Sequence, residues 1–435
     1  MSSKTPLVPR KLIFPFILVT TLFFAWGFAN DITNPMVKAF SKIFRMSVTD
    51  GALVQLAFYG GYFVMAFPAA LFIRKYSYKA GILLGLTLYG AGALLFIPAS
   101  ITGYYYPFLI AYFILTCGLS FLETSSNPYI LSMGDESTAT RRLNLAQAFN
   151  PIGSLLGMFA AMVFIQARMN PMSTAERAQL SMEEFEAVKQ ADLQVLIGPY
   201  VVVGLAVLAL CLIMRFTPMP KNADKDHSLH LGRALKRIFS IPRYREGVIA
   251  QFFYVGVQIM AWTFIIQYGT RIFVNQGMTE QEGEILSQQY NIVAMAIFCV
   301  SRFICTFLLK YFSPGKLLMT LAIGGAILTA GVIGFQDIKG LYCLVGVSAC
   351  MSLMFPTIYG IALQGLGDDA KFGAAGLIMA ILGGSVMPPL QAAIIDCHTI
   401  LGMPAVNVSF ILPFICFIVV MIYGYRSYRI HLRKA

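Results

Sequence analysis

Long apolar runs alternate with short polar connections along the whole chain. An α-helix rises about 1.5 Å per residue, so roughly 20 apolar residues cross the hydrocarbon core of a bilayer. A closed β-barrel would instead show short segments of alternating hydrophobicity. The pattern therefore predicts an all-α, polytopic membrane protein with twelve transmembrane helices, at residues 12–37, 51–74, 80–100, 105–132, 143–166, 194–216, 246–270, 286–310, 315–335, 339–363, 371–395 and 403–425.

Two polar stretches interrupt this pattern, an acidic one at 167–193 and a basic one at 217–245. The second separates six spans from six, so we expect an N-terminal half at 1–216, a cytoplasmic linker at 217–245 and a C-terminal half at 246–435. The second span of each half ends in a similar basic loop, FIRKYSYKAG or LLKYFSPGK. Two related halves that face each other would enclose a cavity.

Within the linker, apolar and basic residues alternate as in a short amphipathic helix lying against anionic lipid headgroups. A regulatory segment is the alternative, and a plain connector between the halves is favoured over it. The residues concerned are Leu229, Leu231, Leu235, Ile238 and Phe239, with Arg233, Lys236 and Arg237.

Composition and charge agree with a membrane location. Of the 435 residues, 58% are hydrophobic and 12% charged, whereas about 25% are charged in soluble domains. The formal charge of +12 could suggest nucleic acid, but Lys and Arg lie in short connections without a recognition motif. With both termini in the cytoplasm, 23 Lys and Arg lie inside and 8 outside, with Arg302 within a span. The positive-inside rule favours this topology, in a bacterial inner membrane.

Several classes of chemistry have no residues to support them. The eight cysteines lie in or beside apolar runs without a CxxC pair, and the four histidines lie in connections or near a terminus, so we expect no metal site and no cofactor. The sequence has no Walker loop, HExxH, GxSxG or dinucleotide-binding fingerprint in a plausible setting. The first apolar run is too long for a signal-peptide core, and we expect it to remain as a span.

Two acidic residues lie deep within predicted spans, Asp31 in FFAWGFANDITNPM and Glu123 in LSFLETSSNPYI. An ionised carboxylate in hydrocarbon costs several kcal/mol unless it faces a cavity or a partner. Such a carboxyl could bind a proton on one side of the membrane and release it on the other. The alternative is a carboxylate that only bonds neighbouring helices.

Amide side chains in the same spans suit the hydroxyl groups of a sugar, since each offers donors and an acceptor. Aromatic side chains beside them could pack on the apolar face of a pyranose. Hydrogen bonding between helices is the alternative for each amide. We predict substrate-binding residues in span 1 (Asn30, Asn34), span 4 (Asn127), span 5 (Gln147, Asn150, near Asn144) and span 7 (Gln251, Tyr254, Gln258, Trp262), and we expect Arg302 to order a helix end or gate.

The motifs FFAWGFAND, AFYGGYF, RKYSYKAGI, FLETSSNP, RLNLAQAFNPIG, AQFFYVGVQ and FPTIYG give the whole chain a definite resemblance. It resembles the fucose permeases, in the fucose-galactose-glucose proton symporter group of the major facilitator superfamily. The resemblance implies that Glu123 occupies the place of the span 4 acid used in substrate binding and proton coupling. It also implies that Gln147 and Asn150 match sugar-binding positions.

Two departures from the family pattern bear on function. Where the family has Asn followed three residues later by Asp, this chain has Asp31 followed by Asn34, so we expect Asp31 to take the proton role. Phe355 stands before Pro356 where a Tyr is expected, which weakens strict fucose selectivity. The usual acidic residue of the facilitator loop after span 2 is replaced by the basic RKYSYK, as is seen in this group.

The sequence therefore predicts a monomeric symporter, not an enzyme. Its substrates would be a proton and a neutral monosaccharide: L-fucose, galactose, glucose or arabinose. Its surroundings would be the lipid bilayer, with no nucleic acid partner. The alternatives are a major facilitator exporter of drugs or metabolites, a membrane sugar sensor and a lipid-modifying enzyme. Sodium remains open as the coupling ion.

Overall fold

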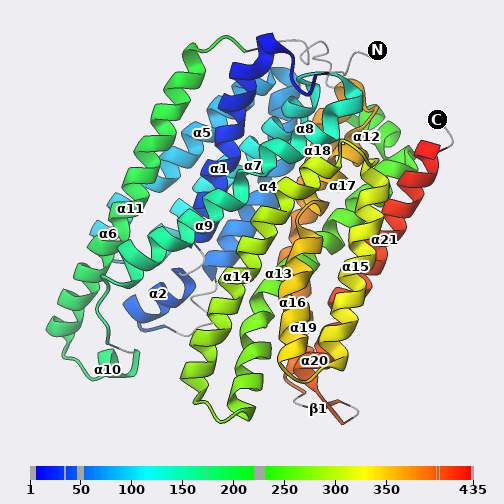
Figure 1. Ribbon diagram of the computed structural model, residues 1–435. Helices are drawn as coiled ribbons and strands as arrows, with labels where there is room; N and C mark the ends of the chain where they lie inside the picture. The colour runs from blue at the N-terminus through cyan, green and yellow to red at the C-terminus, as the bar shows by residue number, and fades with distance from the viewer. Residues whose placement is uncertain are drawn as a thin grey trace. The chain divides into compact units, whose positions relative to one another are not determined.

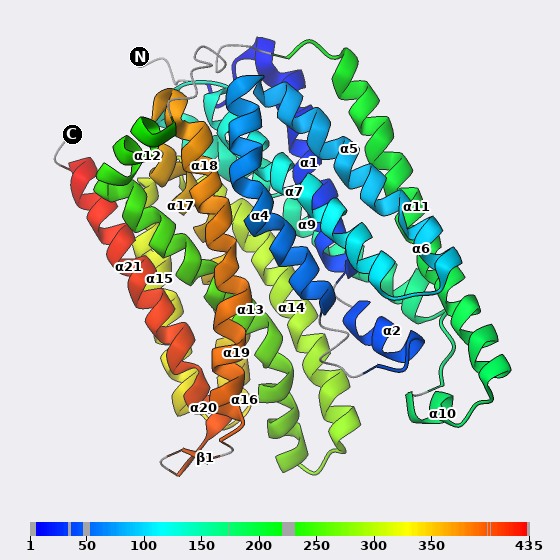
Figure 2. The same cartoon turned by 180° about the vertical axis from the view of Figure 1, so that it is seen from behind.

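The computed structural model describes residues 6–33, 36–46, 53–172, 174–219, 231–397, 399–400 and 402–432. These residues are almost entirely helical (Figures 1 and 2). A two-residue antiparallel pair, β1 (Thr399–Ile400) and β2 (Met403–Pro404), joins the last two spans. Within the described residues, twelve helical segments are long and apolar enough to cross a membrane. The all-α, twelve-span prediction is confirmed.

Contacts divide the chain into two compact units. The N-terminal unit comprises Pro9–Met133 and Phe149–Leu229, and the C-terminal unit comprises Met1–Val8, Gly134–Ala148 and His230–Ala435. A short segment from the middle of the chain thus groups with the second unit. The division into halves at 1–216, 217–245 and 246–435 remains a prediction.

In the N-terminal unit, α7 packs against α4 and α5, and α1 packs against α9. The pairing of α1 with α9 depends on glycine, because a Cβ at Gly153 would overlap the carbonyl oxygen of Phe24. The elements are η1 (Arg10–Leu12), α1 (Ile13–Thr33), α2 (Met36–Ile43), α4 (Leu53–Lys75), α5 (Tyr78–Leu94), α6 (Phe96–Thr102), α7 (Tyr106–Ser132), α9 (Asn150–Ala160), the π-helical turn η3 (Ala161–Gln166), α10 (Thr174–Ala178) and α11 (Met182–Phe216).

In the C-terminal unit, α13 packs against α14, α16, α17, α19 and α21, so it lies at the centre of that unit's apolar core. The elements before the strands are η2 (Glu136–Thr138), α8 (Ala139–Gln147), α12 (Leu231–Ser240), α13 (Pro242–Asn275), α14 (Glu280–Leu308), α15 (Pro314–Gly334), α16 (Ile338–Met351), α17 (Met354–Leu363), η4 (Gly367–Asp369), α18 (Ala370–Met379), η5 (Ala380–Leu382) and α19 (Gly383–Ile395). After the strands come α20 (Ala405–Ser409) and α21 (Ile411–Leu432).

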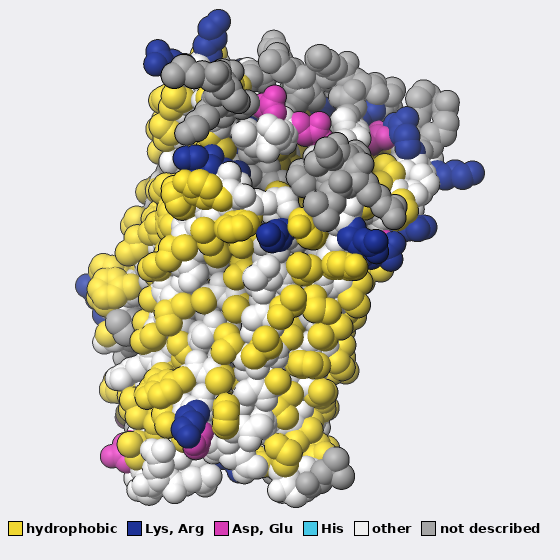
Figure 3. Space-filling model, turned by 45° about the vertical axis from the view of Figure 1, so that its right-hand side comes forward, with side chains coloured by type: hydrophobic (Ala, Val, Ile, Leu, Met, Phe, Trp, Pro, Cys, Tyr) yellow, Lys and Arg dark blue, Asp and Glu magenta, His cyan; other side chains and the backbone are white. Residues whose placement is uncertain are grey.

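The outward-facing side chains of these helices are largely apolar. Figure 3 shows a face whose middle is covered by hydrophobic side chains, with Lys and Arg mainly towards its ends. Ile327 on α15 is 67% exposed and Ile422 on α21 is 49% exposed. An apolar surface of this kind suits hydrocarbon rather than water.

Several predicted spans contain breaks, and two of these breaks lie beside candidate site residues. The span expected at 143–166 is interrupted between Gln147 and Asn150, and the span expected at 339–363 is interrupted between Met351 and Met354. Proline explains both, since its ring has no N–H and clashes with the carbonyl four residues earlier. Pro151 and Pro356 lie just after the two breaks. The amides of span 5 therefore do not share one unbroken helix.

The linker helix α12 packs on the protein along part of its apolar side. Ala234 and Ile238 are buried, and Arg237 forms an ion pair with Asp369. Leu229 and the side chains of Leu231 and Arg233 lie outside the described residues. Contact of this helix with lipid headgroups remains a prediction.

Candidate functional site

Glu123 lies in the middle of α7, where its carboxyl group is buried with 6% exposure. The hydroxyl of Tyr62 on α4 donates a hydrogen bond of 3.0 Å to Oε1 of Glu123. Tyr62 is held in turn because Ser120 on α7 donates to its carbonyl oxygen at 3.2 Å. Adjacent helices of one unit therefore fix the position of this acid.

No Lys or Arg among the described residues forms an ion pair with Glu123. A buried carboxylate without a cation carries an uncompensated desolvation cost. A neutral carboxylic acid avoids that cost and can still accept the Tyr62 hydrogen bond. The surroundings of Glu123 therefore suit a group that gains and loses a proton.

A band of buried polar side chains continues around Glu123. Asn127, one turn further along α7, donates from Nδ2 to the carbonyl oxygen of Glu123 at 3.0 Å. Its predicted role towards substrate remains a prediction. The other buried members of this band on α7 are Thr116, Ser120, Thr124, Ser125 and Ser126.

Of the three residues predicted for the site in span 1, the structure describes the side chain of Asp31 alone. Asp31 is half-buried near the C-terminal end of α1. Asn34 and the side chain of Asn30 lie outside the described residues. The proposed exchange of acid and amide across one helical turn therefore remains a prediction.

Asn150 begins α9 and faces α1. Its Nδ2 donates to the carbonyl oxygen of Phe23 at 3.1 Å, and its backbone lies against Gly27. Ser154, one turn on, donates to the carbonyl oxygen of Gly27 at 3.4 Å. Asn150 thus ties α9 to α1 in the N-terminal unit, and its predicted contact with substrate remains a prediction.

In the C-terminal unit, α13 carries the predicted polar and aromatic stripe. Gln251 is fully buried, and neither atom of its side-chain amide has a partner among the described residues. Gln258 is half-buried. A buried amide without partners costs free energy unless a ligand or water completes its bonds. Gln251 is therefore the member of the stripe that most needs an external partner.

The aromatic members of the stripe already have protein partners. Tyr254 donates from its hydroxyl to the carbonyl oxygen of Met351 at 3.1 Å, and Trp262 donates from Nε1 to Oγ of Ser348 at 3.2 Å. These bonds fix both rings against α16. Phe355 completes an aromatic group, with its ring 6.3 Å from that of Tyr254 and 6.2 Å from that of Tyr359.

Arg302 on α14 bridges the two helix breaks. Its side chain is 3% exposed, donates from Nε to the carbonyl oxygen of Ser352 at 2.5 Å, and donates from Nη1 to the carbonyl oxygen of Gln147 at 3.1 Å. These carbonyls lie four residues before Pro356 and Pro151, which cannot donate to them. The guanidinium replaces both missing helix bonds, as buried membrane backbone requires.

The segment α8 is held to the C-terminal unit by side chains as well. Asn144 donates from Nδ2 to Oγ1 of Thr357 on α17 at 3.1 Å. At the start of this segment Asp135 accepts from the amide and hydroxyl of Ser137. The Ser137 hydroxyl and amide lower the pKa of Asp135, so it stays charged as the cap of η2.

Sequence reasoning missed the contributions of Tyr62 and Ser352. Tyr62 lies in the motif AFYGGYF, but its pairing with Glu123 joins residues 61 positions apart. Pro151 and Pro356 indicate which backbone carbonyl groups lack a helical donor. Nothing in the sequence indicated that Arg302 would donate to those carbonyl groups. Within the described residues, no group of three His, Cys, Asp or Glu could hold a metal ion.

Residues 17–388 match the family model of the Major Facilitator Superfamily. The chain is 51% identical over 427 residues to the L-fucose-proton symporter of Haemophilus influenzae, covering 97% of this chain and 98% of that protein. It is 30% identical over 410 residues to a glucose/galactose transporter of Brucella abortus, covering 93% and 92%.

The fold has a close counterpart among solved structures. The crystal structure of the transporter FucP in the outward conformation matches with a TM-score of 0.87 and 32% sequence identity, covering 96% of this chain and 99% of that chain. The similarity thus extends over nearly all of both chains, in sequence as well as in structure.

Proposed function

Because the chain belongs to the Major Facilitator Superfamily, we propose that it carries a neutral monosaccharide across the membrane together with a proton. The observation that carries this proposal is Glu123, a buried acid hydrogen-bonded to Tyr62 without a cation beside it. The relatives named above are transporters rather than enzymes, and one is an L-fucose-proton symporter.

The proposed mechanism is alternating access. A proton and a sugar bind from outside, the carrier exchanges between its two states, and both are released inside. A ligand shifts such an equilibrium only through different affinities for the two states. Protonated Glu123 must therefore favour the exchange or the sugar-bound form.

The substrate proposed first is L-fucose, with galactose, glucose and arabinose as the related sugars to compare. Gln147, Asn150 and Gln251 are the proposed sugar-binding amides. Phe355 offers a ring without a hydroxyl, so it would pack on a sugar without selecting one hydroxyl pattern. Asp31 is proposed as the second proton-coupling group.

The proposed setting is a bacterial inner membrane, with both termini cytoplasmic and a monomer as the working unit. The excess of Lys and Arg in the inside segments supports this orientation. A tag at either terminus should then be protected from an external protease in intact cells.

Sugar-induced alkalinisation of a weakly buffered cell suspension tests the proposal. Each sugar of the panel is added in medium with and without sodium, and the external pH is followed. A proton symporter gives a rise in pH that persists without sodium. No rise for any sugar, in cells that display the protein, would contradict proton-coupled sugar transport.

Glu123→Gln tests the group that carries the proposal. It should abolish accumulation of labelled sugar against a gradient while retaining some exchange, because it imitates only the protonated acid. The matched control is Glu183→Gln at an exposed position on α11. Wild-type accumulation by Glu123→Gln would remove Glu123 from proton coupling.

A further inference from the structure

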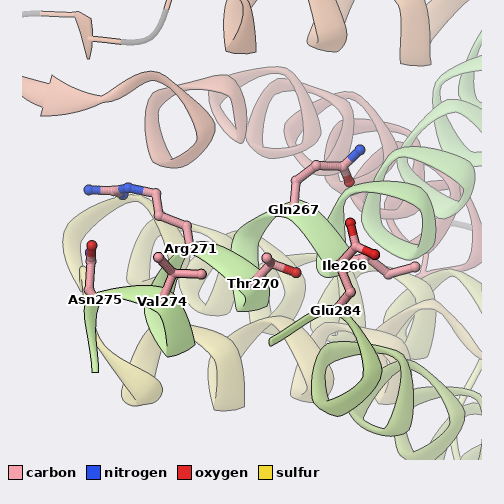
Figure 4. Close-up of a pocket in the computed structure, with 7 residues that line it drawn as sticks. All are labelled: Ile266, Gln267, Thr270, Arg271, Val274, Asn275 and Glu284. Carbon is pink, nitrogen blue, oxygen red and sulfur yellow. The ribbon is translucent and has the colours of Figure 1, made fainter. Parts of the chain in front are cut away.

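A cleft of about 380 Å³ opens beside α13 at the end farthest from α12. This volume lies in the range of small-molecule sites, roughly 300 to 1,000 Å³. Figure 4 shows Arg271 and Asn275 towards one end, Gln267 and Glu284 towards the other, and Thr270 between them. Six of its lining residues come from α13 and one from α14: Ile266, Gln267, Thr270, Arg271, Val274, Asn275 and Glu284.

The guanidinium of Arg271 is held in place by a buried network. Its Nη1 donates to Oδ1 of Asn407 at 2.9 Å. Asn407 is 1% exposed and donates from Nδ2 to the carbonyl oxygens of Val332 at 3.0 Å and Phe335 at 2.9 Å. Tyr268 donates to the same two carbonyls, so the end of α15 anchors the whole group. An arginine ordered in advance loses less entropy when a ligand binds.

The opposite charges of the cleft favour a neutral ligand. Glu284 is exposed and forms no ion pair within the described part of the chain, and Arg271 has its single hydrogen bond there to Asn407. For a free anion or a free cation, the attraction of one of these charges is opposed by the repulsion of the other, so neither ion gains a net attraction. The cleft suits a molecule that has many hydroxyl groups, because it offers guanidinium donors, carboxylate acceptors, amides and a hydroxyl.

The cleft continues the stripe on α13. Thr270, Ile266 and Trp262 are spaced four residues apart, so they follow one side of the helix turn by turn. Thr270 lies about 28 Å from Gln251 along the axis at 1.5 Å per residue. The cleft is thus separate from the buried amide of Gln251. The side of α13 that carries Trp262, Ile266 and Thr270 leads from the cleft towards that amide.

We propose that this cleft is a loading site, where the sugar binds between Arg271 and Glu284 before it reaches the buried stripe of α13. This proposal rests on the proposed function, since its ligand is the transported sugar, and on the proposed orientation, which places the cleft outside the cell. Binding here raises the sugar concentration beside the transport path.

Protection of a cysteine at the rim of the cleft tests this site. Val274 is 42% exposed, and Val274→Cys can be labelled in intact cells by a maleimide that does not cross membranes. The background is Cys397→Ser, because Cys397 is the exposed cysteine among those described. L-fucose, galactose and glucose are tested as protecting ligands, and acetamide, which is neutral and has no hydroxyl group, is the control solute.

The expected result is slower labelling with a transported sugar and no effect of acetamide. Arg271→Gln and Glu284→Gln should each raise the half-protecting concentration about fivefold to tenfold, the effect of losing one hydrogen bond. Arg245→Gln is the matched control, because Arg245 is exposed at the other end of the same helix. Protection should persist in Gln251→Ala, where the buried site is altered.

Three results would overturn the loading site while leaving the proposed function intact: transport without protection, equal protection in Arg271→Gln, Glu284→Gln and Arg245→Gln, or loss of protection in Gln251→Ala. The last would mean that labelling reports the buried site. Absence of sugar uptake in the cysteine-substituted parent and in the unmodified protein would overturn the proposed function, and the loading site with it. Asn275→Cys provides a second labelling position in the same cleft.

Discussion

Arg302 donates a hydrogen bond of 2.5 Å to the carbonyl oxygen of Ser352, the group that Pro356 leaves without its helical donor. The same guanidinium bonds the carbonyl of Gln147, which Pro151 leaves unpaired. One buried side chain therefore satisfies carbonyl groups at the ends of α8 and α16, both in the C-terminal unit. No Asp or Glu among the described residues forms an ion pair with this guanidinium.

Arg302→Met should destabilise the protein, because it leaves both carbonyl oxygens buried without donors. The free energy of unfolding should fall by about 2 to 4 kcal/mol. Each unsatisfied carbonyl costs roughly 1 to 3 kcal/mol, and removal of the buried charge offsets part of this cost. Thermal unfolding in detergent measures this loss of stability. Arg302→Lys should recover part of the lost stability, because its ammonium group can still donate hydrogen bonds. Recovery should be incomplete, because the ammonium group lacks the spaced N–H donors with which the guanidinium reaches both carbonyls.

Pro356→Ala supplies the missing N–H to Ser352 and should therefore rescue Arg302→Met in part. We expect a coupling of about 1 kcal/mol between positions 302 and 356, typical of residues that share a partner. Pro199→Ala, inside α11 of the other unit, is the matched control and should show no coupling. Purely additive effects at 302 and 356 would contradict the shared carbonyl.

The twelve spans were predictable from sequence because hydrocarbon imposes a minimum length of apolar residues on every crossing. The place of Glu123 within a span was also predictable from sequence, and it marked this residue as a candidate because few acids are tolerated in hydrocarbon. The breaks at Pro151 and Pro356 were not predicted, although proline is their local cause, since apolar composition continues through them. Hydropathy identifies a span, but it does not show where a side chain replaces the backbone hydrogen bonds of the helix.

Contacts between residues far apart in the chain could not be predicted from the sequence. The bond between Tyr62 and Glu123 joins two helices, and the grouping of α8 with the C-terminal unit depends on contacts such as Asn144 with Thr357. Gln251 was predicted as a site residue from its place in a stripe. Its lack of partners could be established only from the packed structure.

Tyr62→Phe should weaken coupling while leaving the fold intact. Loss of one hydroxyl removes the hydrogen bond to Glu123, and we expect coupled uptake to fall about fivefold to tenfold, the effect of one such bond. Sugar exchange at equal concentrations should fall less. Tyr76→Phe, at a 51% exposed position, is the control. Equal uptake by both variants would show that the Tyr62 hydroxyl does not act on Glu123.

Gly153→Ala should separate α1 from α9. The added methyl group would overlap the carbonyl of Phe24, and neither backbone can move without disturbing Asn150. Overpacking of this kind costs about 1 to 3 kcal/mol. Gly198→Ala on α11 is the control, because a Cβ there meets nothing within 4 Å. Thermal unfolding should therefore distinguish the two, with Gly198→Ala neutral or stabilising by up to about 1 kcal/mol.

Asp192→Asn should destabilise the loop between η3 and α11, which contains α10. Arg177 is fully buried and lies 2.6 Å from Asp192, which also accepts from the amide of Asn170 at 2.7 Å. Removing one partner leaves a buried charge uncompensated, which costs about 3 to 5 kcal/mol. The control is Glu186→Gln, which breaks the more exposed pair with Lys189 and should cost less than about 1 kcal/mol. Protease sensitivity of the loop, followed in membranes, should rise for Asp192→Asn alone, and equal sensitivity of the two variants would show that the buried pair does not hold this loop.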